Sequence, residues 1–318
     1  MRKSLLFSVL TLVICLVSIS AYTTPPDRPS ERRFDIAVLA DPRDQGDTWK
    51  NALLEIRSGN AGTKPPRAPV ELILVAGDMD PLESRYEDYR NVFTNADTRP
   101  ILLPVIGNHE FENGSVHFRY ARDILIPSLR GAVRRHPVSC DYYLDHRNVR
   151  IIAVDGYTEL GKGGVINERG SQWVEQVIKE TPSSMDHIFI AFHEPAFPRF
   201  RHIGNSFDKD PELRNAFWGM LLRHREKVRA VLVGHTHSYY RLRVRDPAGK
   251  SANDPGTFPD EDGGIFQIDA GSAGNSPTST IIQVQIAGRN VFFRVLQAKQ
   301  GANQPFFEVD KWSIVQPP

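Results

Sequence analysis

The stretch VRAVLVGHTH, residues 228–237, joins an apolar run to a short loop that carries two histidines. Residues 228–233 are typical of a buried strand, and Gly234 marks the turn that ends it. Because His235 and His237 are two positions apart, both rings can converge on one centre from a tight loop. Neutral imidazole is a common transition-metal ligand. The pair alone is weak evidence, since two surface histidines can fall at this spacing by coincidence.

Strand-like and helix-like segments alternate along most of the chain. Apolar β-rich runs predict strands, and amphipathic stretches between them predict helices. The predicted strands cover residues 34–40, 70–76, 101–106, 188–192 and 228–233, and the predicted helices cover 48–57, 86–93, 167–180 and 211–227. The first three strand–helix units indicate a parallel sheet that is buried on both faces. A hairpin over 141–154 and a β-rich segment over 265–296 complete the pattern.

Five of these predicted strands end in residues that can bind metal. The strand ends carry Asp41, Asp78, Asn108 with His109, His193, and His235 with His237. In open parallel sheets, sites form where the carboxyl ends of strands meet, so these side chains are expected on one rim. Asp78 could instead cap a helix and Asn108 could cap a turn. Caps do not readily explain all five strand ends together, so the sequence predicts a metal site.

These motifs resemble the ordered motifs of the calcineurin-like metallophosphoesterases. The resemblance rests on Gly77-Asp78, Gly107-Asn108-His109-Glu110, His193 and the stretch 234–241, which fits the GHxHxYxR form of the branch that includes purple acid phosphatases. It implies an α/β fold with four layers, a double β-sandwich flanked by helices. It also implies two metal ions, side by side at the carboxyl ends of the strands.

The resemblance assigns a role to each position. Asp78 would bridge both metals; Asn108, His193 and His235 would complete one metal site; Asp41 and His237 would serve the other. His109 would lie near the leaving group as an acid or electrostatic stabiliser. Paired metals lower the pKa of a bound water, orient the phosphoryl group and neutralise its charge. The mixed nitrogen and oxygen ligands suit Fe, Mn, Zn or Co without choosing among them.

The first motif departs from the family pattern. Many members have Asp-x-His, whereas this chain has Asp41-Pro42-Arg43, and arginine has no lone pair to give a metal. A tyrosine shortly after Gly77-Asp78, as in purple phosphatases, is also absent from the sequence. Three interpretations of Arg43 stay open. It turns away and leaves water or Asp44 to fill the place, it points inward and holds a substrate phosphate, or it marks a site that binds metal poorly.

Other features set the context of the site. His202 lies in the loop 193–211 and could face the substrate, although a surface position is its default interpretation. The net charge of +1 gives no support for a nucleic-acid partner.

The N-terminus predicts a signal peptide over 1–21, because it has Arg2 and Lys3, an apolar run over 5–17 and small residues near 21. We therefore expect a periplasmic or secreted protein without a stable membrane anchor. After cleavage one cysteine, Cys140, would remain, which excludes an internal disulfide.

The predicted organisation is a signal peptide (1–21), a Pro-rich lead-in (22–33), one metallophosphoesterase domain (34–300) and a tail (301–318). The predicted function is metal-dependent hydrolysis of small phosphomonoesters or phosphodiesters, with one or two metal ions. One alternative is a degenerate family member that binds metal or phosphorylated ligands with little turnover, which Arg43 supports. Another is a nuclease or nucleotide pyrophosphatase on the same fold. The substrate and the oligomeric state do not follow from the sequence.

Overall fold

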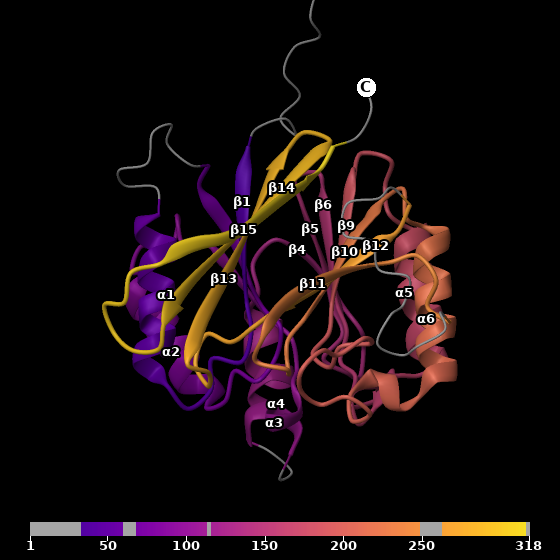
Figure 1. Ribbon diagram of the computed structural model, residues 1–318, viewed down its shortest axis with the longest axis horizontal. Coiled ribbons are helices and arrows are strands. Elements are labelled where there is room, and N and C mark those ends of the chain that lie inside the picture. The colour runs from indigo at the N-terminus through magenta and orange to yellow at the C-terminus, as the bar shows by residue number, and fades with distance from the viewer. Residues whose placement is uncertain (1–32, 60–67, 113–115, 249–262, 316–318) are drawn as a thin grey trace, which may run out of the picture.

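A computed structural model describes residues 33–59, 68–112, 116–248 and 263–315. Within these residues, two large sheets face each other (Figure 1). The first has the strand order β15 (Phe307–Ile314), β14 (Asn290–Lys299), β13 (Thr278–Ala287), β1 (Phe34–Leu39), β2 (Val70–Val75) and β3 (Ile101–Pro104). The second has the order β11 (Tyr239–Val244), β12 (Ile265–Ala270), β10 (Val228–Val233), β9 (His187–Ala191), β6 (Val149–Ala153), β5 (Tyr142–His146) and β4 (Ala132–Arg135).

Helices cover the outer faces of both sheets. Figure 1 shows α1 (Gly46–Ser58) and α2 (Leu82–Val92) outside the first sheet, and α5 (Glu168–Lys179) and α6 (Pro211–Arg223) outside the second. The shorter elements are α3 (Asn108–Phe111), α4 (Val116–Tyr120), the π-helical turn η2 (Ala121–Leu125), the 3₁₀ turns η3 (Ile126–Ser128) and η4 (Phe207–Lys209), and the small hairpin of β7 (Gly161–Lys162) and β8 (Val165–Ile166). The predicted four-layer α/β double sandwich is therefore confirmed.

Alternation along the central strands explains why their sequences are apolar at nearly every position. On β9, Phe189 packs into the core between the two sheets, whereas Ile188 and Ile190 pack into the core under α5 and α6. On β10, Leu232 and Val233 divide in the same way. Successive side chains of a strand point to opposite faces, so a strand between two covered faces needs apolar residues throughout. Each such side chain stabilises the fold by about 1.5–3 kcal/mol.

Parallel pairing brings the carboxyl ends of the ligand-bearing strands to one edge. In the first sheet β1, β2 and β3 are parallel, and their last residues are in register, with Leu39 beside Val75 and Val75 beside Pro104. In the second sheet β6, β9, β10 and β12 are parallel, with Leu232 beside Ala191. β1 is completed on its other side by β13, an antiparallel partner from far along the chain. The loops that follow β1, β2, β3, β9 and β10 therefore meet.

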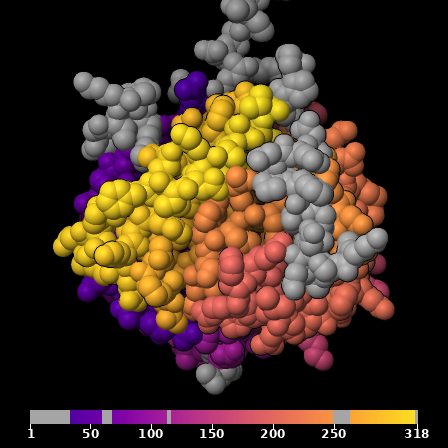
Figure 2. Space-filling model, in the orientation of Figure 1, coloured from indigo at the N-terminus to yellow at the C-terminus, as the bar shows by residue number. Residues whose placement is uncertain are grey.

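One strand lies where the sequence predicted a tail. β15 falls in the segment 301–318 that was predicted as a tail, and it pairs with β14 in the first sheet. Its Asp310 accepts hydrogen bonds from the Tyr239 hydroxyl (2.5 Å) and from Arg241 Nε (2.8 Å) on β11. Figure 2 shows the yellow β14–β15 region and the orange β11 region side by side on one face. β15 thus ties the edge of the first sheet to the strand that follows His237.

Some predictions concern residues outside the described ranges. These are the signal peptide over 1–21, nearly all of the lead-in over 22–33, and most of the loops 58–69 and 246–264. The helix predicted over 211–227 ends earlier, at Arg223, because the chain turns at His224 and enters β10 at Val228. Among the described residues, no helix combines the length and the apolar character needed to cross a membrane. Cys140 is buried and free.

Candidate metal centre

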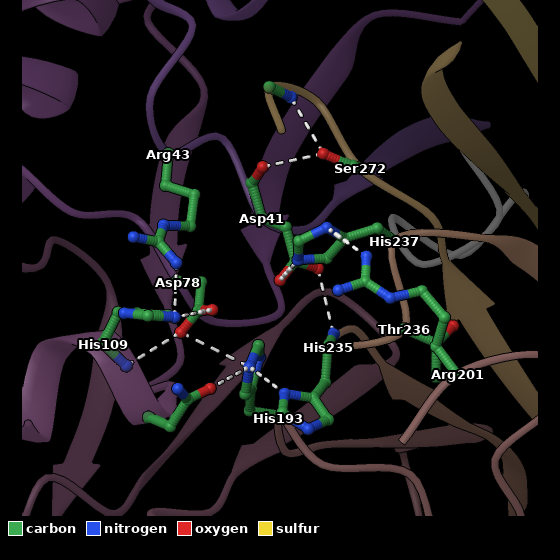
Figure 3. Close-up of polar contacts among 12 residues, drawn as sticks. Asp41, Arg43, Asp78, His109, His193, Arg201, His235, Thr236, His237 and Ser272 are labelled. Atoms are coloured by element: carbon green, nitrogen blue, oxygen red, sulfur yellow. Dashed lines mark hydrogen bonds and ion pairs between the residues drawn. The ribbon is translucent and has the colours of Figure 1, made fainter. Parts of the chain in front are cut away.

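Four residues at the strand ends have a left-handed backbone. The φ angles are 48° at Asp41, 53° at Asp78, 72° at His235 and 57° at His237. For residues other than glycine this conformation costs on the order of 1–3 kcal/mol, and such residues gather at functional sites, where the surrounding structure holds them. Here the left-handed conformation directs each side chain from the end of its strand toward a common centre (Figure 3).

Two glycines let these loops pack closely. Gly77 has φ of +91°, and a Cβ at this position would lie 2.2 Å from Nδ1 of His193. A Cβ at Gly107 would lie 2.2 Å from Oδ1 of Asp78. Any side chain at either place would push a predicted ligand out of position. The glycines of the Gly-Asp and Gly-Asn-His motifs are therefore steric requirements of the centre.

The first group of predicted ligands, which we call the His193 group, converges on Nε2 of His193. It comprises His193, Asp78, Asn108 and His235. Nε2 of His193 lies 3.3 Å from Asp78 Oδ1, 3.2 Å from Asn108 Oδ1 and 3.2 Å from His235 Nδ1. Nδ1 of His193 donates to the Ala76 carbonyl (2.8 Å), which leaves the lone pair of a neutral ring on Nε2. When the His193 ring is neutral, four atoms that carry lone pairs face one another, which is the arrangement that a cation satisfies.

The second group, which we call the Asp41 group, comprises Asp41, Asp78 and His237. One possible ligand atom from each of the three lies within 4.8 Å of those of the others. Nε2 of His237 is 3.3 Å from Oδ1 of Asp41, and this oxygen is buried without a hydrogen-bond partner among the described residues. The other Asp41 oxygen accepts the His235 backbone N–H at 2.9 Å. The Asp41 carbonyl accepts the Ser272 hydroxyl, also at 2.9 Å. Asp78 therefore stands between the two groups.

Arg43 points toward the centre and not away from it. Its Nη1 donates to Nε2 of His109 (Figure 3). Its Nε lies 3.5 Å from both Asp80 Oδ1 and Asp44 Oδ2. Nε2 of His109 is also 3.8 Å from Asp78 Oδ2, and its backbone N–H donates to Asp78 Oδ1 at 3.1 Å. The guanidinium and His109 thus lie together beside Asp78. The interpretation in which Arg43 turns away does not match this conformation.

The loop after β9 adds two residues. His202 stacks on His235 with ring centroids 4.1 Å apart, so it lies at the rim of the centre. Arg201 Nη1 donates to Nδ1 of His237 at 2.9 Å. The sequence carried no signal for this contact of Arg201, because it depends on the path of the loop. Phe200 and His202 have left-handed backbones, with φ of 67° and 58°, on either side of Arg201.

Two buried carboxyl groups support the ligand loops from behind. Oε2 of Glu110 accepts the backbone N–H groups of Asp78 (3.0 Å) and Gly107 (2.8 Å). Burial, together with the negative charge of Asp78, raises the pKa of Glu110 to about 8. Asp269 accepts the Thr236 hydroxyl at 2.6 Å, and burial raises the pKa of this carboxyl well above its ordinary value. The sequence analysis did not identify Asp269, since nothing in the run 265–270 distinguishes it from a strand residue.

The electrostatics of the His193 group are strongly coupled. Burial opposes the charged form of both Asp78 and His193, but their mutual attraction outweighs it. The pKa of Asp78 is therefore well below its usual range, and the pKa of His193 is well above it. Burial, reinforced by the charge of His193, lowers the pKa of His235 to about 2. Asp78 is therefore ionised and the His235 ring is neutral, so both can bind a cation beside His193.

All the residues that the sequence proposed for this site meet at one edge of the sheets. Asp41, Asp78, His109, Asn108, His193, His235 and His237 surround the centre, with Arg43 and His202 at its border. The donor set fits a transition metal because three nitrogen or amide donors and a carboxylate face one point in the His193 group. Which of these residues bind metal or substrate stays a prediction.

Comparison with known proteins bears on this site. A sequence model of the calcineurin-like phosphoesterases matches residues 34–239. Similar solved structures include a purple acid phosphatase, PPD1 of yellow lupin (Lupinus luteus), with 12% identity and a TM-score of 0.56 over 90% of this chain. PhoD has 9% identity and a TM-score of 0.55 over 87% of this chain and 72% of its own. This chain spans 54% of the lupin phosphatase. No curated protein sequence matches the chain.

Proposed function

Because the chain belongs to the calcineurin-like phosphoesterase family, we propose that it is a metal-dependent enzyme that hydrolyses small phosphomonoesters or phosphodiesters. The observation that carries the proposal is the convergence of Asp78, Asn108 and His235 on Nε2 of His193 within 3.2–3.3 Å. A bound metal of the Fe, Mn, Zn or Co type would polarise a phosphoryl oxygen and supply an activated water.

The protein's own groups prepare the site for that chemistry. Asp78, Asn108, His193 and His235 would hold the metal, and the Ala76 carbonyl fixes the His193 ring by accepting its Nδ1–H. Glu110 fixes the loop of Asp78 by accepting two backbone N–H groups. These contacts reduce the reorganisation that ligand binding would require.

His109 is proposed as the catalytic residue nearest the leaving group. Its side chain is 28% exposed, whereas that of Asp78 is 2% exposed, so a substrate would meet His109 from the solvent side. Arg43 and His202 are proposed as substrate-binding residues, because Arg43 contacts His109 beside Asp78 and His202 stacks on His235. Arg43 also keeps open the alternative of a family member that binds phosphorylated ligands with little turnover.

Hydrolysis of p-nitrophenyl phosphate and of its bis ester tests the proposal. We expect metal-stimulated release of nitrophenol from one or both, and a loss of more than about a hundredfold in His193→Ala, because a metal ligand is removed. The His117→Ala variant, at a half-buried position in α4, is the matched control, with expected activity close to that of the natural chain. No turnover of either ester with Mn²⁺, Zn²⁺, Co²⁺ or Fe²⁺, with phosphate binding retained, would instead support the binding protein.

Export is a separate proposal that rests on the sequence of residues 1–21 alone. We expect the mature protein in the periplasm or the medium, with a new N-terminus near residue 22. Cell fractionation with N-terminal sequencing measures both. Retention of an intact N-terminus in the cytoplasm would contradict this proposal without affecting the proposed chemistry.

A further inference from the structure

We propose that this chain holds one metal ion, in the His193 group, and that Arg43, positioned by Asp80, takes the place of a second ion as the binding site for phosphoryl oxygens. The inference rests on the proposed function and refines it. It concerns the Asp41 group, where Arg201 contacts His237 and Arg43 occupies the sequence position at which the family pattern has a histidine. Three observations carry it.

The first observation is the chemistry of position 43. The family pattern places a histidine there, whereas the Arg43 guanidinium stays protonated and offers no lone pair. The side chain also points inward, so it brings a positive charge to the border of the Asp41 group instead of a ligand. A second cation would have to bind beside this charge, and among the described residues its protein ligands would be Asp41, Asp78 and His237.

The second observation is the hydrogen bonding of His237. Arg201 Nη1 donates to its Nδ1 at 2.9 Å, so Nδ1 must carry a lone pair. The proton of the neutral ring is then on Nε2, which lies 3.3 Å from Asp41 Oδ1. A protonated Nε2 has no lone pair and cannot coordinate a metal. The contact of Arg201 with His237 therefore opposes a second ion.

The third observation is the placement of the Arg43 guanidinium. Nε lies 3.5 Å from a carboxylate oxygen of Asp80 and from one of Asp44, which hold the side chain from one side. Nη1 contacts His109, which lies beside Asp78. The Arg43 side chain is 20% exposed, so its outer edge can be reached from solvent. A guanidinium edge binds two phosphoryl oxygens through parallel N–H groups, which suits the anion that a neighbouring metal would also attract.

Metal counting tests the stoichiometry. The full chain is stripped with a chelator, equilibrated with Mn²⁺ or Zn²⁺ in separate samples, and the bound metal is measured by mass spectrometry after equilibrium dialysis. We expect one ion per chain, and two tightly bound ions would overturn the inference while leaving the proposed function intact. Binding of no ion would contradict the proposed function itself, and the inference with it.

Inorganic phosphate tests the role of Arg43. Its Kd for the metal-loaded protein is measured by calorimetry, and we expect Arg43→Ala to raise it about ten- to hundredfold with the metal count unchanged. Arg43→Lys should recover only part of the affinity, because an ammonium lacks the two parallel N–H groups. Asp80→Asn should weaken phosphate binding less than Arg43→Ala, since Asp80 acts through Arg43.

The matched control is Arg223→Ala, which removes an exposed guanidinium paired with Glu175 on the outer helices. Its phosphate Kd should equal that of the natural chain. Arg43→Ala within about twofold of the natural Kd would overturn the assignment, and so would loss of the bound metal in Arg43→Ala. Thermal unfolding shows that each variant is folded.

A double variant tests the exclusion of the second ion. In Arg43→His with Arg201→Ala, position 43 gains a lone pair and Nδ1 of His237 loses its donor. We expect the metal count to rise from one to two. A count that stays at one in the folded double variant would overturn the claim that these two arginines keep the second ion out.

Discussion

The two ligand groups of the centre share Asp78 and the same strained backbone, but they differ in what surrounds them. In the His193 group, lone pairs converge and the proton of the His193 ring is directed to a backbone carbonyl. At the Asp41 group, Arg43 stands where the family pattern has a histidine, and Arg201 donates to His237. The left-handed φ angles of Asp41 and His237 are nevertheless kept. The backbone conformation of these loops can therefore be kept while the side chains that face a metal change.

Removing one histidine from each group should have very different effects. We expect His193→Ala to lower metal affinity by more than about a hundredfold, because three other ligands meet at its Nε2. His237→Ala should lower it by less than about tenfold, because in our interpretation the contact of Arg201 with Nδ1 keeps the proton of the His237 ring on Nε2, which then offers no lone pair to a metal. Metal dissociation constants from competition with a chromophoric chelator measure both. Equal losses of metal affinity in the two variants would show that the two groups contribute equally to metal binding, against our interpretation.

Lowering the pH should release the metal. The charge of Asp78 raises the pKa of His193, so this ring binds a proton in the metal-free protein, and a metal must displace it. Affinity is then highest at alkaline pH, and it falls by about tenfold for each pH unit below the raised pKa while one proton is displaced. Metal dissociation constants measured between pH 6 and 9 check the slope. A pH-independent constant would show that the His193 group is not the metal site.

The residues of the centre could be predicted from the sequence because they follow apolar strands in a fixed order. Asp41 and His193 directly follow such a run, Asp78 comes one residue later after Gly77, and parallel pairing carries them to one edge. The four-layer fold followed from the resemblance and from strands that are apolar on both faces. These inferences needed only local patterns and one topological rule.

The contacts that distinguish the two groups could not be predicted, because they depend on tertiary geometry. The direction of Arg43 is set by Asp80 and His109, and the contact of Arg201 with His237 is set by the path of a loop. β15 was missed because its exposed alternation of apolar and charged residues is a weak strand signal next to a polar turn. Its place is fixed by pairing with β14.

Glu110 lies behind Asp78, the residue that the two groups share, which gives a third test. Burial raises its pKa to about 8, so the folded protein favours the protonated form, whereas the unfolded chain ionises near pH 4.5. The folded state therefore binds more protons across this interval, and the free energy of unfolding should decrease as pH rises from 5 to 8. In Glu110→Gln, which keeps an acceptor for both N–H groups, this decrease should be smaller by about 1–3 kcal/mol.

Urea unfolding of the metal-free proteins at each pH measures the effect of Glu110→Gln. Glu112→Gln is the matched control, since Glu112 is an exposed carboxylate on the same turn. If the free energy of unfolding changed with pH in the same way for the natural chain and for Glu110→Gln, the raised pKa of Glu110 would be contradicted.

The smallest expected effect lies on the other side of the centre. Asp310→Asn weakens the bonds from Tyr239 and Arg241 that tie β11 to β15, and β11 begins two residues after His237. We expect a loss of about 0.5–1.5 kcal/mol in stability, because the carboxylate is partly exposed. In Asp310→Asn, backbone amide hydrogen exchange should become faster in residues 237–244 and stay unchanged in β9. Equal changes in both segments would show that the two groups are not supported independently.

The pairing of β1 with β13 has a consequence for the order in which the centre is made during translation. Asp41, Asp78 and Asn108 leave the ribosome early, but β1 must wait for residues 278–287 before its second edge is covered. Pairing between such distant segments is slow, since the intervening chain must first be closed into a loop. We therefore expect the nascent chain to carry its carboxylates exposed until β13 emerges. The metal would then be acquired as a late step of biogenesis, after most of the polypeptide has been synthesised.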